Sequence, residues 1–123
     1  MAAKILFVED EPLARNLFCQ VLRNEGYRVI EAGDGTEALE LLQTQHVDLV
    51  ISDVMMPKMQ GTRFVEHLRS FHPGIPVMLI TGYLSEVSGK NILQDVAEIM
   101  PKPIDLDAFR STVKRLLDNS ATA

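Results

Sequence analysis

Acidic residues follow two short apolar runs in this sequence. Glu9 and Asp10 come directly after the run 4–8, and Asp53 comes directly after the run 47–52. Both runs have the length of a buried strand. If the two strands are neighbours, three carboxylates meet at one edge of a sheet, and each pair about 4 Å apart costs about 4 kcal/mol at an effective dielectric constant of about 20. The cluster therefore needs a neutralising partner, either a proton, which raises one pKa, or a cation.

We favour a divalent cation as that partner. Mg²⁺ takes carboxylate oxygens, keeps several waters and shares its oxygens with phosphate. With its charge shielded, Asp53 can attack phosphorus as a nucleophile, while the Thr81 hydroxyl and the Lys102 ammonium hold the oxygens of the transferring phosphoryl group. Taken alone, each of these residues is more often a helix cap, a turn residue or a solvated charge. Their joint position at the ends of apolar runs predicts phosphoryl transfer onto a carboxylate.

The elements that position these residues follow from the hydrophobic pattern, in which strand-length apolar runs alternate with amphipathic helical segments. We expect strands at residues 4–8, 27–32, 47–52, 76–80 and 96–100. We expect helices that begin at Pro12, after Gly35 and after Gly61, a weak helix at about 85–93, and a final helix capped by Asp105. The weak helix contains Ser88-Gly89, and we expect mobility there.

The alternation of nearly continuous apolar strands with helices predicts a parallel sheet covered by helices on both faces. Right-handed crossovers leave few topologies, so we predict an α/β fold with a doubly wound, five-stranded sheet in the flavodoxin-like order 2-1-3-4-5. Ligands of such a sheet bind beyond the carboxyl ends of the strands, where the strand order reverses. The first and third strands meet there, which brings together Glu9, Asp10 and Asp53.

Length and composition limit the classes of function. The 123 residues fit one domain, which we expect at 1–119, with a frayed tail at 120–123. Twelve Lys and Arg residues against seventeen Asp and Glu residues give a net charge of −5, and no dense basic block is present, so we expect no direct binding of nucleic acid. The apolar runs are too short for a signal peptide or a membrane span, so we expect a cytoplasmic protein without membrane contact.

Four segments together resemble the receiver domain of two-component response regulators, namely 5–12 (ILFVEDEP), 52–61 (SDVMMPKMQG), 79–83 (LITGY) and 101–103 (PKP). The resemblance covers essentially the whole chain. It implies that a sensor histidine kinase or a histidine phosphotransfer protein donates a phosphoryl group from phosphohistidine, and that phosphorylation shifts a conformational equilibrium. A receiver of this kind catalyses its own phosphorylation but is a switch and not a turnover enzyme, and it signals to an output domain or an effector protein.

The resemblance also implies roles for individual residues. The implied site consists of Asp53 as phosphoacceptor, Thr81 and Lys102 as phosphoryl-binding groups, and, around Mg²⁺, Asp10 as a direct ligand, Glu9 as a ligand through water and Met55 as a ligand through its backbone carbonyl. A small Gly82 keeps the acceptor accessible, Met55 and Tyr83 tune how long the acyl phosphate lasts, and the Lys102–Pro103 peptide bond is cis.

The chain departs from the receiver pattern at two positions. Glu9 stands where receivers most often have Asp, although the longer side chain still permits a contact through water. Ile99 stands where receivers usually carry an aromatic residue that swings inward as Thr81 moves toward the phosphate. Because Ile is smaller and restricted at χ1, we expect the switch to act mainly through the loop after Thr81 and the weak helix at 85–93.

The first helix has more apolar residues than one core-facing stripe needs, namely Leu13, Ala14, Leu17, Phe18, Val21 and Leu22. Either all of them are core residues, or part of the set stays exposed. We expect Ala14 and Phe18 to be exposed beside Pro103 and Ile104, where the helices of the phosphodonor would dock.

Two other functions compete with a phosphorylated receiver. An Asp-dependent, Mg²⁺-dependent phosphohydrolase also uses a nucleophilic Asp and a Lys, but such enzymes usually carry a second acid two residues after the nucleophile, where this chain has Met55. A pseudo-receiver that only binds protein is disfavoured because the full acidic set is present. A further alternative is that the chain is a receiver module of a hybrid histidine kinase, with the same phosphoryl-transfer chemistry.

Overall fold

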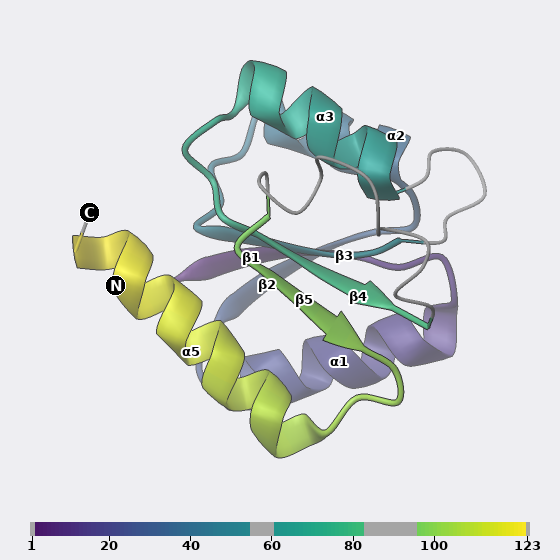
Figure 1. Ribbon diagram of the computed structural model, residues 1–123, viewed down its shortest axis with the longest axis vertical. Coiled ribbons are helices and arrows are strands. Elements are labelled where there is room, and N and C mark those ends of the chain that lie inside the picture. Colours follow the sequence, from purple (N-terminus) through teal and green to yellow (C-terminus); the bar gives the residue numbers. More distant parts are fainter. Residues whose placement is uncertain (1, 55–60, 83–95, 123) are drawn as a thin grey trace.

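The computed structural model describes residues 2–54, 61–82 and 96–122 (Figure 1). The helix expected at about 85–93, and with it most of the segment expected to carry the switch, lies outside the described residues. The predicted site residues Met55 and Tyr83 lie outside them as well. No helix in the described part of the chain is long enough and apolar enough to cross a membrane.

The described strands form a single parallel sheet. Their bounds are β1 (Lys4–Val8), β2 (Arg28–Ala32), β3 (Leu49–Asp53), β4 (Val77–Thr81) and β5 (Glu98–Pro101). Neighbouring strands are parallel throughout, and their order is β2-β1-β3-β4-β5. The predicted doubly wound sheet and its strand order are confirmed. The order reverses at the β1–β3 pair, which is therefore the expected position of a ligand site.

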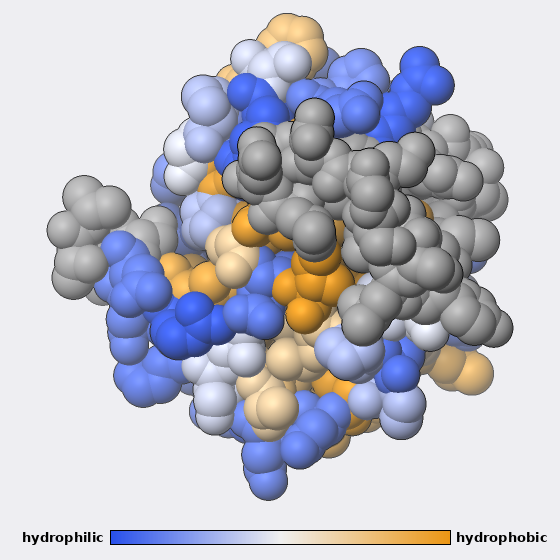
Figure 2. Space-filling model, in the orientation of Figure 1, coloured by the Kyte–Doolittle hydropathy of each residue, from blue (hydrophilic) through white to orange (hydrophobic). Residues whose placement is uncertain are grey.

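Helices cover both faces of the sheet. Their bounds are α1 (Pro12–Asn24), α2 (Gly35–Leu42), α3 (Gly61–Phe71) and α5 (Leu106–Thr122). Figure 1 shows α2 and α3 on one side of the sheet and α1 and α5 on the other. In the same view, Figure 2 shows mostly hydrophilic residues over α5 and hydrophobic residues near the middle of the face, over β5.

The central strands are buried on both faces, and for this reason their sequences are almost continuously apolar. In β1, Leu6 and Val8 belong to the core cluster beneath α2 and α3. Ile5 and Phe7 belong to the second cluster, beneath α1 and α5. The alternation continues past the end of the strand, so the side chain of Glu9 is expected on the same face as Phe7.

Local signals start the helices close to the ends of the strands. Pro12 occupies the first turn of α1, and Glu11 caps it by accepting a hydrogen bond from the Leu13 backbone N–H at 3.1 Å. Asp34 caps α2 in the same way through the Glu37 backbone N–H. Only three residues therefore connect β1 to α1, and two of them are the acidic residues of the predicted site.

The structure corrects the expectation for the first helix. Leu13 is 80% exposed and Leu17 is 54% exposed, whereas Ala14 and Phe18, which were expected to be exposed, are half-buried. The Phe18 ring stacks on Phe7 with the ring centroids 5.8 Å apart, and it packs against another ring on α5. The cause is the rotation of α1 about its own axis. Tertiary packing sets this rotation, and the width of the apolar stripe in the sequence does not predict it.

The ends of several elements differ from the sequence prediction by a few residues. The strands β2, β3, β4 and β5 begin one or two residues later than expected. Helix α5 continues to Thr122, into the segment expected to be frayed. None of these shifts moves a predicted site residue away from the carboxyl ends of the strands.

Candidate functional site

The predicted site residues of the four neighbouring strands lie at one edge of the sheet. Asp53 and Thr81 are the last residues of β3 and β4, and Glu9 and Lys102 each lie one residue beyond β1 and β5. The Glu9 backbone N–H donates to the Ala32 carbonyl at 3.0 Å, and the Lys102 backbone N–H donates to the Thr81 carbonyl at 2.7 Å. The backbone hydrogen bonds of the sheet thus extend to Glu9 and Lys102, two residues that carry predicted site side chains.

An ion pair joins Lys102 and Asp53. Lys102 Nζ donates a hydrogen bond to Asp53 Oδ2 at 2.6 Å. The Asp53 side chain is 7% exposed and the Lys102 side chain is 44% exposed. Desolvation lowers the pKa of Lys102, but the hydrogen bond to Asp53 and the nearby negative charges outweigh it, so the pKa is raised. Lys102 is therefore protonated and offsets the charge of the buried carboxylate.

Glu9 is a buried acid beside this ion pair. Burial, together with the hydrogen bond to Asp53 and the negative charge of Asp53, raises the pKa of Glu9 from 4.5 to about 8. In the metal-free protein Glu9 is thus mostly protonated at neutral pH. A proton was one of the two neutralising partners that the sequence predicted for the carboxylates at this edge. The Lys102 ammonium supplies further neutralising charge, through Asp53.

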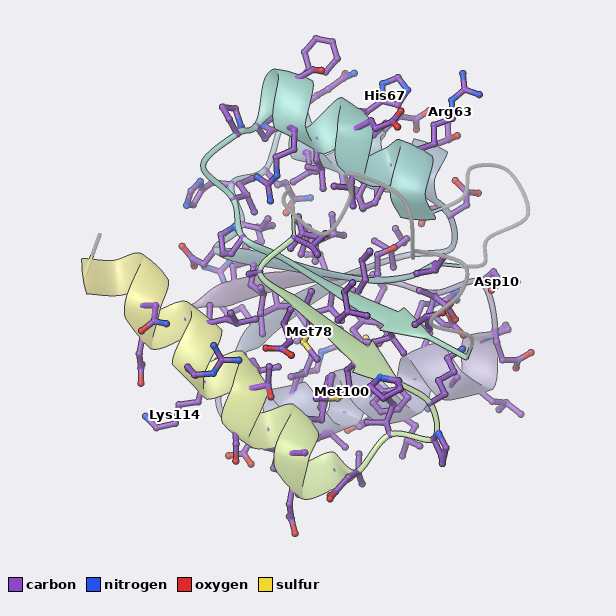
Figure 3. The ribbon with its side chains drawn as sticks, viewed as in Figure 1. Asp10, Arg63, His67, Met78, Met100 and Lys114 are labelled. Atoms are coloured by element: carbon purple, nitrogen blue, oxygen red, sulfur yellow. The ribbon has the colours of Figure 1, made fainter. Side chains whose placement is uncertain are left out.

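Asp10, the third predicted acid, is exposed. Figure 3 shows it at the rim of the molecule, at the side where the strands end and α1 begins. Among the described residues, no group of three or more His, Cys, Asp or Glu side chains is arranged to hold a metal ion. The described side chains of Glu9, Asp10 and Asp53 therefore do not form a complete ligand set, and the fourth predicted ligand, Met55, lies outside the described residues.

One observation at this edge nevertheless fits a hard cation. Glu9 Oε2 is buried and has no hydrogen-bond partner among the described residues. A buried acceptor without a donor costs about 1–3 kcal/mol. A cation held at this edge, directly or through a bound water, would satisfy this oxygen, and an all-oxygen donor set is the one that Mg²⁺ prefers. The residues present therefore fit such an ion.

A small cavity of about 40 Å³ lies directly beside the ion pair. Glu9, Asp53 and Lys102 line it, together with the half-buried Ala14 and Phe18 of α1. The two α1 residues predicted to face a phosphodonor thus lie next to the predicted phosphoacceptor. Ile104, the third predicted docking residue, is half-buried and packs against the core cluster beneath α1 and α5.

Of the remaining predicted residues, Gly82 and Pro103 lie just beyond the carboxyl ends of β4 and β5, whereas Ile99 lies inside β5, paired with Leu79 of β4. The Thr81 side chain is fully buried, and Gly82, the residue after it, is exposed. The Lys102–Pro103 peptide bond is cis. Ile99 is half-buried and packs against the core cluster beneath α2 and α3.

Sequence reasoning missed two residues that hold the backbone of the site. Arg15 Nη1 donates to the backbone carbonyl of Glu9 at 2.8 Å. Ser52 Oγ donates to the backbone carbonyl of Asp53 at 2.9 Å. The pattern that could have indicated Arg15 is a basic residue one turn into a helix that starts directly after acidic residues. Its spacing alone does not show which acceptor its guanidinium contacts. Ser52 gave no signal beyond its position next to the acid.

Comparisons with known proteins agree on one kind of domain. A family model described as the response regulator receiver domain matches residues 5–114. The sensor kinase CckA of Brucella abortus is 38% identical over 120 residues, which is 95% of this chain and 13% of CckA. The transcriptional regulatory protein GlrR of Escherichia coli is 35% identical over 122 residues, which is 98% of this chain and 28% of GlrR. The chain thus spans less than a third of the length of these relatives.

The fold has counterparts among solved structures. The response regulator protein TrrA of Thermotoga maritima, crystallised in complex with Mg²⁺-BeF, has a TM-score of 0.86 and 31% sequence identity to this chain. The match covers 94% of this chain and 99% of TrrA. The similarity in fold therefore extends over nearly the whole chain.

Proposed function

The chain belongs to the response regulator receiver domain family of two-component signalling, and on this premise we propose that Asp53 is its phosphoacceptor. The observation that carries the proposal is the contact of the Lys102 ammonium with a carboxylate that is only 7% exposed and ends a central strand. A carboxylate held beside a cation at such an edge is placed to attack an incoming phosphoryl group.

The donor in this proposal is a phosphohistidine of a sensor histidine kinase or a histidine phosphotransfer protein. One Asp53 carboxylate oxygen attacks phosphorus, the phosphorus–nitrogen bond breaks, and its electron pair returns to the imidazole nitrogen. Lys102 and the Thr81 hydroxyl bind the phosphoryl oxygens as negative charge builds up on them. The exposed Gly82 leaves room above the acceptor, and we assign Tyr83 and Met55 to tuning the lifetime of the acyl phosphate.

Mg²⁺ is the cofactor that we propose for this site. When bound, it supplies positive charge that offsets the oxygens of the phosphoryl group. Its holders would be Asp10 directly, Glu9 through water, Asp53, and the backbone carbonyl of Met55. Two observations support this assignment, namely the buried Glu9 oxygen without a partner among the described residues and the Mg²⁺-BeF complex of TrrA.

We propose that the chain is a switch and not a turnover enzyme. Receiver domains are signalling switches, in which the modified acid shifts a conformational equilibrium. The rival function is an Asp-dependent phosphohydrolase, which usually needs a second acid two residues after the nucleophile. This chain has Met55 at that position, which favours the switch.

The partners follow from what the chain resembles. Its curated relatives include a sensor kinase and a transcriptional regulator, both several times longer than the chain. We therefore propose that the signal passes in the cytoplasm to an output domain or effector protein, or that the chain is the receiver part of a hybrid histidine kinase. The phosphodonor would dock on α1, where Leu13 and Leu17 are exposed beside the half-buried Ala14 and Phe18, and on Pro103 and Ile104.

A labelling experiment tests the phosphoacceptor. Incubation with acetyl phosphate and Mg²⁺ should add one phosphoryl group, detected by intact mass, and base should remove it as it does from an acyl phosphate. Asp53→Asn should abolish the modification. Asp107→Asn, at an acid of α5 whose side chain is 95% exposed, is the matched control and should label like the wild type. Labelling that persists in Asp53→Asn would place the acceptor elsewhere.

A further inference from the structure

The backbone of the acidic corner is held from both sides. On one side, the Glu9 N–H donates to the Ala32 carbonyl of β2 at 3.0 Å. On the other, the Glu9 carbonyl accepts a hydrogen bond from Arg15 Nη1 at 2.8 Å. This carbonyl belongs to the peptide plane that joins Glu9 to Asp10, so the bond from Arg15 restrains the direction in which both acidic side chains leave the chain.

The Arg15 side chain is itself fixed. Its Nε donates to Glu31 Oε1 at 3.2 Å, and the Arg15 side chain is only 24% exposed. The other Glu31 oxygen accepts a hydrogen bond from Arg23 Nη2 at 3.1 Å. Arg23 also donates to the Val29 carbonyl of β2 at 3.0 Å. The guanidinium of Arg15 is thus anchored to β2 while it reaches the loop between β1 and α1.

We infer that Arg15, anchored by Glu31, is a positioning residue for the cation site of this receiver, because it orients the peptide plane between Glu9 and Asp10. The inference rests on the proposed function, since it concerns the ion proposed there. Arg15 contacts a backbone carbonyl and Glu31, and it is not itself a ligand. In this role it resembles the groups in metal sites that hold the ligands in place without binding the metal. Loss of such a group typically weakens metal binding about 10- to 100-fold.

The direction in which the Kd for Mg²⁺ changes when Arg15 is removed distinguishes a positioning role from an effect of its charge alone. Arg15 carries a positive charge near a cation site, so by charge alone its removal would tighten Mg²⁺ binding. Glu31 offsets much of that charge through the ion pair, which leaves orientation as the main effect of the side chain. A positioning role therefore predicts weaker Mg²⁺ binding without Arg15, the opposite of what charge alone predicts.

The test is a Mg²⁺ titration of the full chain, followed by amide chemical shifts in NMR spectra. Arg15→Met keeps an unbranched apolar stem but removes the guanidinium, and we expect it to raise the Kd for Mg²⁺ about tenfold. Arg69→Met is the matched control, because Arg69 Nη1 also donates to a backbone carbonyl, that of Pro73 at 2.9 Å, but at the end of α3. It should leave the Kd unchanged. Arg15→Lys keeps the charge but not the two-acceptor geometry, so it should restore only part of the affinity.

A second readout excludes a general loss of folding. In EDTA, Arg15→Met should keep the dispersed amide shifts of a folded protein, so that its weaker Mg²⁺ binding is not a loss of the fold. A Kd within twofold of wild type, tighter binding, or full rescue by Arg15→Lys would overturn the inference while leaving the proposed function intact. An equal loss in Arg69→Met would overturn it as well. A wild-type protein whose shifts do not respond to millimolar Mg²⁺ would instead remove the proposed cofactor, and this inference with it.

Discussion

Lys102 and Glu9 neutralise the acidic edge of the sheet in different ways. Lys102 places a cation on Asp53, and Glu9 retains a proton because burial and the neighbouring carboxylate raise its pKa to about 8. Under the proposed function, both arrangements would change when a divalent cation and a phosphoryl group bind. The Glu9 carboxyl group would lose its proton on facing a cation, and the Lys102 ammonium would move from Asp53 toward the phosphoryl oxygens.

The pH dependence of stability without metal tests the state of Glu9. An acid whose pKa is higher in the folded than in the unfolded protein binds more protons when folded, so its contribution is full below about 4.5 and is lost as the pH rises to about 8. The stability of the wild type relative to Glu9→Gln should therefore fall over this range, by at most about 1.4 kcal/mol per pH unit. Urea unfolding in EDTA measures the difference, and Glu40→Gln, exposed on α2, is the control. A difference independent of pH would contradict the raised pKa.

Lys102→Met separates phosphoryl binding from metal binding. Loss of one preorganised group that stabilises charge in a transition state typically costs about 100-fold or more in rate, so we expect labelling by acetyl phosphate to slow by that order. The Kd for Mg²⁺ should stay the same or fall, because a positive charge near the ion has been removed. Weaker Mg²⁺ binding with an unchanged labelling rate would reverse the roles that we propose.

At the scale of elements, α1 has two apolar parts with different consequences. Phe18 lies between Phe7 and Phe109, with ring centroids at 5.8 Å and 5.2 Å, so it joins α1 to the sheet and to α5. Leu13 and Leu17 face solvent on the same helix. Ala14 and Phe18 of this helix line the cavity beside Asp53. The exposed leucines are the part of α1 that a partner helix can bury.

A charged residue at Leu13 should therefore affect the partner and not the fold. Leu13→Glu should slow phosphoryl transfer from a phosphohistidine donor about tenfold while acetyl phosphate labels the variant like the wild type, since about 1.4 kcal/mol of lost docking energy corresponds to a factor of ten. Phe71→Glu is the matched control, because Phe71 is 72% exposed but lies on α3. Equal slowing by both variants would argue against docking on α1.

Phe18→Ala should have the opposite profile. A half-buried ring that contacts two other rings is a packing residue, and its truncation should destabilise the domain by about 2–3 kcal/mol, below the range of about 3–5 kcal/mol for a fully buried Phe. Denaturant unfolding measures this loss. A change below about 0.5 kcal/mol would show that Phe18 belongs to the exposed docking surface, as the sequence alone suggested.

For the whole molecule, the proposed ion links site chemistry to global stability. A ligand that binds only the folded state adds about 2.7 kcal/mol at a concentration of 100 times its Kd. Saturating Mg²⁺ should therefore raise the midpoint of thermal unfolding by several degrees, and EDTA should reverse the rise. Asp10→Asn removes one proposed ligand and should reduce the shift. An equal shift in the wild type and in Asp10→Asn would assign the stabilisation to another site.

The amino-acid sequence by itself determined the order and type of the described elements and the edge of the sheet where the candidate site lies. Strand-length apolar runs alternating with amphipathic segments have few parallel-sheet solutions, and acidic or polar residues directly after those runs must gather at the carboxyl ends of the strands. Asp53, Thr81, Glu9 and Lys102 were found in this way, because their positions depend only on where each strand ends.

Tertiary structure decided how these side chains interact. The ion pair of Lys102 with Asp53 joins residues 49 positions apart, and the bond from Arg15 to the Glu9 carbonyl depends on how α1 packs on the sheet. The exposure of Leu13 depends on the same packing. Hydrophobic patterns specify that a helix has an apolar face, but its rotation and the direction of each charged side chain are set by the neighbours that it meets, and those neighbours come from distant parts of the chain.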